Sequence, residues 1–165
     1  ALDGLMMGTR CGALDPGALL YLMEADRLTP AQLSQLLYRE SGLLGVSGVS
    51  DDTRVLLERE ADDERCRLAL ALYVDRIVRD IGGLAALLGG LDLLAFTAGV
   101  GEHNAVIRER VCGALAFLGA RLDPAANQAH APTISTADSK VLLAVVPTNE
   151  EWVAASQALR LLRSG

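Results

Sequence analysis

Residues 91–104 read LDLLAFTAGVGEHN, a run whose hydrophobic period changes at two glycines. All but two of residues 91–98 are apolar, and glycines stand on both sides of them, which is typical of a short buried strand. Gly99 and Gly101 then favour a tight turn. Asn104 is a suitable N-cap for a following helix. The apolar residues of that helix recur at three- to five-residue spacing: Val106, Val111, Leu115 and Leu118. The pattern predicts a strand, a glycine turn and a helix.

Such a turn can bind an anion. It brings backbone N–H groups to the positive end of a helix dipole, where a phosphate can approach without meeting a Cβ atom. Two other interpretations remain open. An ordinary strand-to-helix connection needs no ligand, and a dinucleotide-binding fold would use Asp123 as the acid roughly twenty residues beyond the glycines. Against the second, Asn104 stands where that fingerprint has its third glycine.

The composition limits the class of protein. The chain has 165 residues, of which 51% are hydrophobic, enough for the core of one domain. A net charge of -6 without a cluster of Lys and Arg argues against a nucleic-acid partner. Residues 82–101 are mostly apolar, but their six glycines and Asp92 argue against a membrane span. The three cysteines are widely spaced and indicate a reducing compartment, the cytoplasm, rather than a disulfide framework.

The N-terminal segment presents an arginine between glycines. Residues 5–7 are apolar and predict a strand that delivers Arg10 into a loop flanked by Gly8 and Gly12. A guanidinium suits a developing phosphoryl charge because it is a permanently charged fork with several donors. A surface arginine at a strand end is the alternative interpretation.

Helix signals follow along the chain. Asp15 with Pro16 starts one helix, and Thr29 with Gln32 forms the capping box of another. After Ser41 the chain shows no clear helical period, and we expect a loop. Ser50 is the expected cap of the next helix. A long helix is predicted over residues 61–88, with Leu68 and Leu72 packed inward, and Gly82-Gly83 could break it.

The C-terminal part ends in a strand and a helix. Residues 124–139 read as irregular, and residues 141–146 as a buried strand. Asn149 can cap the last helix, whose first turn holds Glu150 and Glu151. Acids are common there for electrostatic reasons alone, but one carboxylate could also help to hold Mg²⁺ beside nucleotide phosphates. The two histidines, His103 and His130, are too isolated in the sequence to indicate zinc.

Four blocks together resemble the acetate kinase (acetokinase) family, in that family's order. They are LDGLMMGTRCG with LDPG at 2–17, ESGLLGVSGVSDDTR at 40–54, FTAGVGEHN at 96–104 and VPTNEE at 146–151. The resemblance covers essentially the whole chain. It implies an α/β fold, a ribonuclease H-like domain of the sugar kinase, heat-shock protein and actin superfamily. It also implies Mg-dependent transfer of a phosphoryl group between ATP and acetate, giving acetyl phosphate and ADP.

The resemblance also implies roles for individual residues. Arg10 matches the arginine that stabilises the transferring phosphoryl group, and Glu150 matches a glutamate associated with Mg²⁺. The matches to nucleotide-binding residues are Asp52, Thr53 and Arg54 on the adenosine side, and Gly99, Val100, Gly101, Glu102 and His103 on the phosphate side. Four positions depart from the family's usual residues: Cys11, Ala13, Thr53 and His103.

The resemblance places residues 1–165 in the C-terminal, nucleotide-binding domain. We therefore expect an N-terminal domain of the same enzyme as a partner, because the family's acid-binding residues lie there, and a homodimer paired through the C-terminal domains. Two alternatives stay open. One is a propionate or butyrate kinase of the same family, and the other is a non-catalytic nucleotide-binding or dimerisation module.

Overall fold

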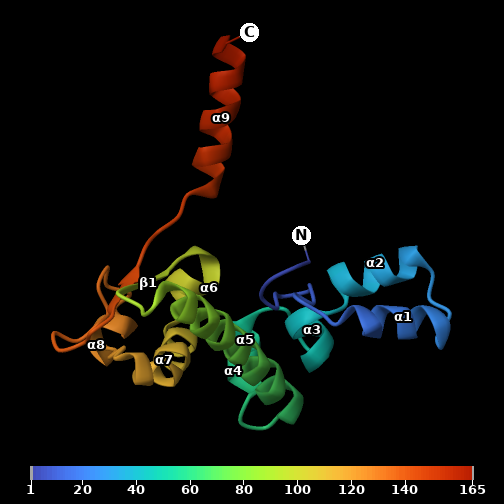
Figure 1. Cartoon of the computed structure of the whole chain (residues 1–165), viewed down its shortest axis with the longest axis horizontal. Helices are drawn as coiled ribbons and strands as arrows, with labels where there is room; N and C mark the ends of the chain where they lie inside the picture. Colours follow the sequence, from blue (N-terminus) through green and yellow to red (C-terminus); the bar gives the residue numbers. More distant parts are fainter. Residues whose placement is uncertain (1, 165) are drawn as a thin grey trace. The chain divides into compact units, whose positions relative to one another are not determined.

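The computed structural model of the chain describes the backbone of residues 2–164 and all side chains among them except those of residues 150, 154, 163 and 164. The chain divides into two compact units, Ala1–Gly90 and Leu91–Gly165, which we describe one at a time. Figure 1 labels the α-helices of both units and strand β1. Among the described residues, no helix combines the length and the apolar character that crossing a membrane requires.

The first unit is built of five helices within its described residues. Their bounds are α1 Pro16–Glu24, α2 Pro30–Arg39, α3 Gly42–Ser47, α4 Thr53–Arg59 and α5 Glu64–Leu88. The long α5, drawn in green in Figure 1, packs against α3 and α4. The side chains of Leu43, Leu56, Cys66 and Leu70 are buried there. This unit is therefore a helical layer whose core lies along the first half of α5.

Side-chain caps start these helices. Asp15 accepts a hydrogen bond from the N–H of Gly17, which confirms the predicted start of α1. The expected capping box of α2 is present, because Thr29 accepts from the Gln32 N–H and Gln32 accepts from the Thr29 N–H. Each cap satisfies N–H groups that a helix start leaves unpaired.

Several predictions for the first unit are wrong. Residues 5–7 form no strand; instead, the irregular segment is held by backbone hydrogen bonds, such as those from Leu43 to Met7 and from Leu44 to Gly8. The expected loop after Ser41 contains α3, which ends at Gly48 in the left-handed conformation. Asp52, rather than Ser50, caps α4 by accepting from the Arg54 N–H.

The long helix also differs in detail. It starts at Glu64 and runs unbroken through Gly82 and Gly83 to Leu88. Leu68 and Leu72 are 51% and 37% exposed, whereas the buried face carries Cys66, Ala69, Leu70, Val74 and Ala85. The four-residue spacing of Leu68 and Leu72 correctly predicted a helix, but the prediction that their face is the buried one was wrong.

The second unit contains a small parallel sheet. Strand β1, Leu93–Phe96, pairs in parallel with β2, Leu142–Val145, with Leu93 opposite Leu142 and Phe96 opposite Val145. Both strands were predicted, with slightly longer bounds. The remaining elements are α6 Ala98–His103, α7 Ala105–Ala114, the 3-10 turn Ala116–Leu118, α8 Pro124–Gln128 and α9 Glu150–Ser164. The α/β class is confirmed.

The core of the second unit lies where α7 meets the sheet region. Its fully buried apolar side chains include Val111, Leu115, Ile134, Val141 and Leu143. The predicted cap of α7 is confirmed, because the Asn104 side chain accepts from the Ile107 N–H at 3.1 Å. The stretch expected to be irregular contains α8, capped by Asp123. The glycine turn is also corrected: Gly99 and Gly101 lie inside the helix α6, and the left-handed residue is Ala98, with φ of 58°.

Candidate functional site

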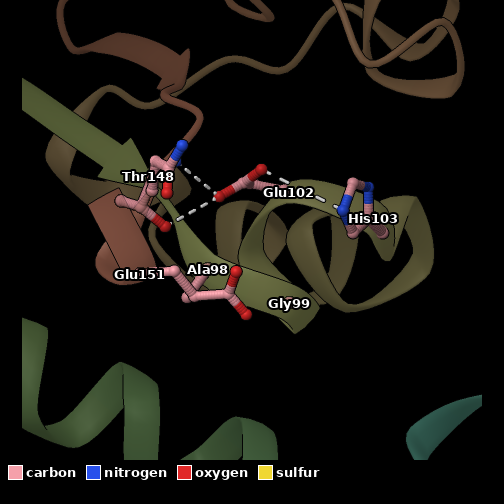
Figure 2. A pocket seen from close by; sticks show the side chains of 7 residues that line it. Ala98, Gly99, Glu102, His103, Thr148 and Glu151 are labelled. Atoms are coloured by element: carbon pink, nitrogen blue, oxygen red, sulfur yellow. Dashed lines mark hydrogen bonds and ion pairs between the residues drawn. The ribbon is translucent and has the colours of Figure 1, made fainter. Parts of the chain in front are cut away.

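An open cavity lies at the carboxyl ends of the two strands. Because β1 and β2 are parallel, the segments that leave them, α6 and residues 146–149, emerge at the same edge of the sheet. The cavity has a volume of about 430 Å³. Its lining residues are Ala98, Gly99, Glu102, His103, Thr148, Asn149 and Glu151 (Figure 2).

Glu102 joins the two segments that form this cavity. Its Oε1 accepts hydrogen bonds from the backbone N–H of Thr148 at 2.9 Å and from the Thr148 hydroxyl at 3.1 Å. Figure 2 shows the Glu102 side chain between Thr148 and His103, whose Nε2 lies 4.0 Å from the second carboxylate oxygen. The Thr148 N–H holds the pKa of Glu102 below its ordinary value, because it stabilises the charged form.

The start of α9 supplies the opposite side of the cavity. Asn149 caps this helix, as predicted, by accepting from the Trp152 N–H at 2.8 Å. The positive end of the α9 dipole is therefore close to the cavity, and Glu151 contributes a carboxylate to the lining. The arrangement combines backbone groups suited to an anion with an acidic side chain suited to a cation.

The glycines of α6 have different surroundings. A Cβ atom on Gly99 would meet no other atom within 4 Å, so this backbone faces open space in the cavity wall. A Cβ atom on Gly101 would lie 3.2 Å from the carbonyl carbon of Phe96, at the end of β1. Gly101 thus permits α6 to fold back closely on the strand. Neither Val100 nor Gly101 lines the cavity.

The structure brings Asp52, Thr53 and Arg54 together in the first unit, at the start of α4. The carboxylate of Asp52 forms an ion pair with Arg54 at 2.6 Å, and Thr53 is buried. The hydrogen bond from the Arg54 side chain lowers the pKa of Asp52, and the same bond raises the pKa of Arg54. The Arg54 side chain is 80% exposed, which leaves its guanidinium accessible to a ligand.

Arg10 lines a second cavity, which lies within the first unit. This cavity has a volume of about 300 Å³ and is formed mainly with α2, through Ser34, Gln35, Tyr38 and Arg39. Arg10 itself is exposed. Two arginines without a carboxylate in the lining make this a positively charged hollow.

The side chain predicted to contact a metal cannot be placed. Glu150 starts α9, but its side chain lies outside the described residues. Among the side chains that are described, no group of three or more His, Cys, Asp and Glu residues could hold a metal ion. A metal at the first cavity would therefore need oxygen ligands from a bound anion or from water.

Sequence reasoning did not identify Thr148 as a partner of Glu102, 46 residues away. A signal was available, however. Two apolar runs that pair as parallel strands bring the residues following them to one edge, so the segment after each strand belongs to the same site. Ala98 gave no signal, because alanine is an unusual residue at positive φ.

Comparison with known proteins identifies the family. Residues 1–156 match the model of the Acetokinase family. The chain is 54% identical over 167 residues to an acetate kinase of Rhodopseudomonas palustris strain TIE-1, covering 100% of this chain and 42% of that protein. It is 48% identical over 161 residues to an acetate kinase of Rickettsia felis, covering 98% and 41%.

Solved structures agree with this match. The crystal structure of Porphyromonas gingivalis acetate kinase superimposes with a TM-score of 0.87 at 44% identity, covering 98% of this chain and 41% of that one. A propionate kinase from Francisella tularensis superimposes with a TM-score of 0.85 at 33% identity, covering 91% and 39%. The chain thus spans about two fifths of the length of these relatives. By its sequence, its fold and the order of its motifs, the chain belongs to the Acetokinase family.

Proposed function

We propose that this chain is the nucleotide-binding part of an acetate kinase, which transfers a phosphoryl group between ATP and acetate to give acetyl phosphate and ADP. The observation that carries the proposal is the cavity between α6 and the start of α9, at the carboxyl edge of a parallel sheet. Ligands of open α/β sheets bind at such edges. The match of residues 1–156 to the Acetokinase family supports the choice of reaction.

The proposed nucleotide site assigns phosphates to the first cavity. Gly99, Val100, Gly101, Glu102 and His103 would form its phosphate side, with the bare backbone at Gly99 allowing close approach. Mg²⁺ fits this cavity as an ion held mainly by phosphate and water oxygens, beside the lining carboxylates of Glu151 and of Glu102, the latter already bonded to Thr148. Glu150 remains the residue that the family resemblance favours for the metal.

In the first unit, Arg10 is the proposed catalytic residue. Its guanidinium would neutralise charge on the transferring phosphoryl group. Asp52, Thr53 and Arg54 would contact the adenosine. The exposed guanidinium of Arg54 and the positively charged hollow around Arg10 support these assignments.

A propionate kinase is the second candidate, since a propionate kinase from Francisella tularensis has a similar fold. The reactions differ only in the length of the carboxylate, whose proposed binding residues belong to an N-terminal domain. Relative kcat/KM for acetate and propionate, measured on an enzyme that carries both domains, distinguishes the two.

We further propose that the chain works with an N-terminal domain and as a homodimer in the cytoplasm, with the ribonuclease H-like fold of its superfamily. Exposed apolar side chains support contact with a partner surface, for example Leu87 on α5 and Leu162 on α9, which are 86% and 81% exposed. Sedimentation velocity tests the dimer, and a monomer at micromolar concentration would contradict it.

Nucleotide binding by this chain is the decisive experiment. If the cavity binds phosphates, MgADP should raise the unfolding temperature with a concentration dependence that follows mass action. Adenosine at the same concentrations should raise it less, because it lacks the phosphates. A folded chain whose unfolding temperature does not move at several millimolar MgADP would overturn the proposal.

A further inference from the structure

Arg108, on α7, is completely buried. Its exposed fraction is 0%, and it is the largest of the fully buried side chains in the described part of the chain. Burying a guanidinium is costly unless each of its N–H groups finds an acceptor. The hydrogen-bond acceptors around Arg108 therefore show what its buried guanidinium does in the fold.

The five donors of Arg108 have five acceptors. Nε donates to Oδ1 of Asn127 at 2.7 Å, and Nη1 donates to the carbonyl oxygens of Gly101 and Glu102, each at 2.8 Å. Nη2 donates to the carbonyl oxygen of Asn127 at 2.7 Å and lies 3.0 Å from Nδ1 of His130. Because a guanidinium can only donate, Nδ1 of His130 is the acceptor in this last contact.

None of these acceptors is a carboxylate, so the cluster is not a salt bridge. Burial lowers the pKa of Arg108, yet arginine stays protonated in proteins. The neighbouring Cys112 supplies no negative charge either, since burial raises the pKa of its thiol to about 12. The positive charge is instead met by the negative ends of two helices, because Gly101 and Glu102 lie in the last turn of α6 and Asn127 in the last turn of α8.

This arrangement ties the phosphate side of the proposed site to the core. Arg108 donates to the backbone carbonyl oxygens of Gly101 and Glu102 from within the core. The side chain of Glu102 in turn accepts a hydrogen bond from Thr148 at the cavity. Asn127 is also fixed, because its Nδ2 donates to the carbonyl oxygen of Ala105 at 2.9 Å. The cluster thus determines where the last turn of α6 lies.

We propose that Arg108 is a positioning residue for the nucleotide site, which holds α6 in its binding geometry through the carbonyls of Gly101 and Glu102. The inference rests on the proposed function, and Arg108 itself does not line the cavity. A residue that only fills space would be replaceable by lysine with little local effect. A lysine ammonium, however, has three donors and cannot reproduce the planar fork.

The test compares Arg108→Lys with Arg121→Lys in this chain. Arg121 is an exposed arginine of the same unit, paired with Asp138 on the surface, so its variant controls for the change of residue type. Hydrogen exchange is followed at the amides of residues 101–104, and MgADP affinity by calorimetry. In Arg108→Lys, both exchange rate and dissociation constant should rise by about tenfold or more, the scale of losing bonds from a charged donor.

The outcomes separate the two proposals. A folded Arg108→Lys chain with unchanged exchange at residues 101–104, or with unchanged MgADP affinity, would overturn the positioning role. A wild-type chain without affinity for MgADP would overturn the proposed function, and the exchange data would then decide whether Arg108 orders α6. If Arg108→Lys does not fold, His130→Gly provides the milder variant, because glycine has no side-chain acceptor and tolerates the positive φ of 50° at that position. Its exchange at residues 101–104 should rise by a smaller factor, and no rise would overturn the proposal.

Discussion

Gly99 and Gly101 lie in the same short helix but serve different purposes. An added Cβ at Gly101 would press on the end of β1, whereas one at Gly99 would extend into open space at the cavity. We therefore expect Gly101→Ala to destabilise the chain by about 1–3 kcal/mol, the usual cost of an overpacked contact. Gly99→Ala should leave stability unchanged or slightly higher, since alanine favours a helix.

The same pair separates binding from packing. Gly99→Ala should weaken MgADP binding, because its methyl group occupies the space that a phosphate would enter. Thermal unfolding with and without MgADP measures both quantities for each variant. Equal loss of stability in the two variants would show that α6 does not pack on β1 in the way described.

Glu102 makes the stability of the second unit depend on pH. The Thr148 N–H lowers the pKa of Glu102 below its ordinary value of 4.5 in the folded chain. The stabilisation from this carboxylate is therefore complete above pH 4.5 and is lost as the pH falls through the lower, folded pKa. Glu102→Gln should be less stable than the wild type near neutral pH, and the difference should shrink in acid.

Denaturant unfolding of both chains from about pH 7 to about pH 3, a range that spans the titration of carboxylic acids, measures this difference. If the free energies of unfolding of the wild type and of Glu102→Gln changed with pH in parallel, the proposed stabilisation of the Glu102 carboxylate by Thr148 would be contradicted.

At the scale of the elements, α5 offers a simple test of helix energetics. Gly82 and Gly83 lie within this continuous helix, and an added Cβ at either position would meet no atom within 4 Å. Each change to alanine should stabilise the first unit by about 0.5–1 kcal/mol, because glycine loses more backbone entropy in a helix. Gly42→Ala is the contrasting variant: Gly42 has a φ of 65°, and a Cβ there would overlap the carbonyl oxygen of Met7. The unfolding temperature of Gly42→Ala should be far below that of the wild type. A lower unfolding temperature for Gly83→Ala would contradict a continuous helix at that position.

Elements set by local interactions were predictable from the sequence. The capping box of Thr29, the cap at Asn104 and the strands near residues 91–98 and 141–146 depend on neighbouring residues or on a short continuous run of apolar residues. The short helices α3 and α6 were not predicted, because about two turns are too few to show a period. Their positions depend on contacts distant in sequence, such as the bond from Leu43 to Met7 and the contact of Gly101 with β1.

The candidate site, too, was predictable from the sequence only in part. Gly99, Glu102 and His103 were predicted from one contiguous motif, and they do line a common cavity. Arg108 was not singled out, because a buried arginine cannot be distinguished from an exposed one by pattern. Only the fold shows that four of its N–H groups donate to residues of α6 and α8 and that the fifth lies against Nδ1 of His130.

At the scale of the whole molecule, the chain spans 42% of its Rhodopseudomonas palustris relative. Phosphoryl transfer in the proposed enzyme needs groups on both sides of the nucleotide, so the chemistry must be tested in a longer protein. A chimera in which this chain replaces the matching segment of that relative provides it. The chain carries the motifs at 2–17, 40–54, 96–104 and 146–151 into the chimera, and it is 54% identical to that relative over 167 residues.

Arg10 is the residue to change in this chimera. If its guanidinium neutralises charge that grows in the transition state, Arg10→Ala should lower kcat by about a hundredfold or more while the KM for ADP changes little. Arg10→Lys should recover only part of the rate, since a point charge does not reproduce the fork. Arg39→Ala, which removes the other arginine of the same cavity, is the matched control and should cost much less. A raised KM for ADP with unchanged kcat in Arg10→Ala would make Arg10 a binding residue, because an interaction made equally in the ground state and the transition state affects KM alone.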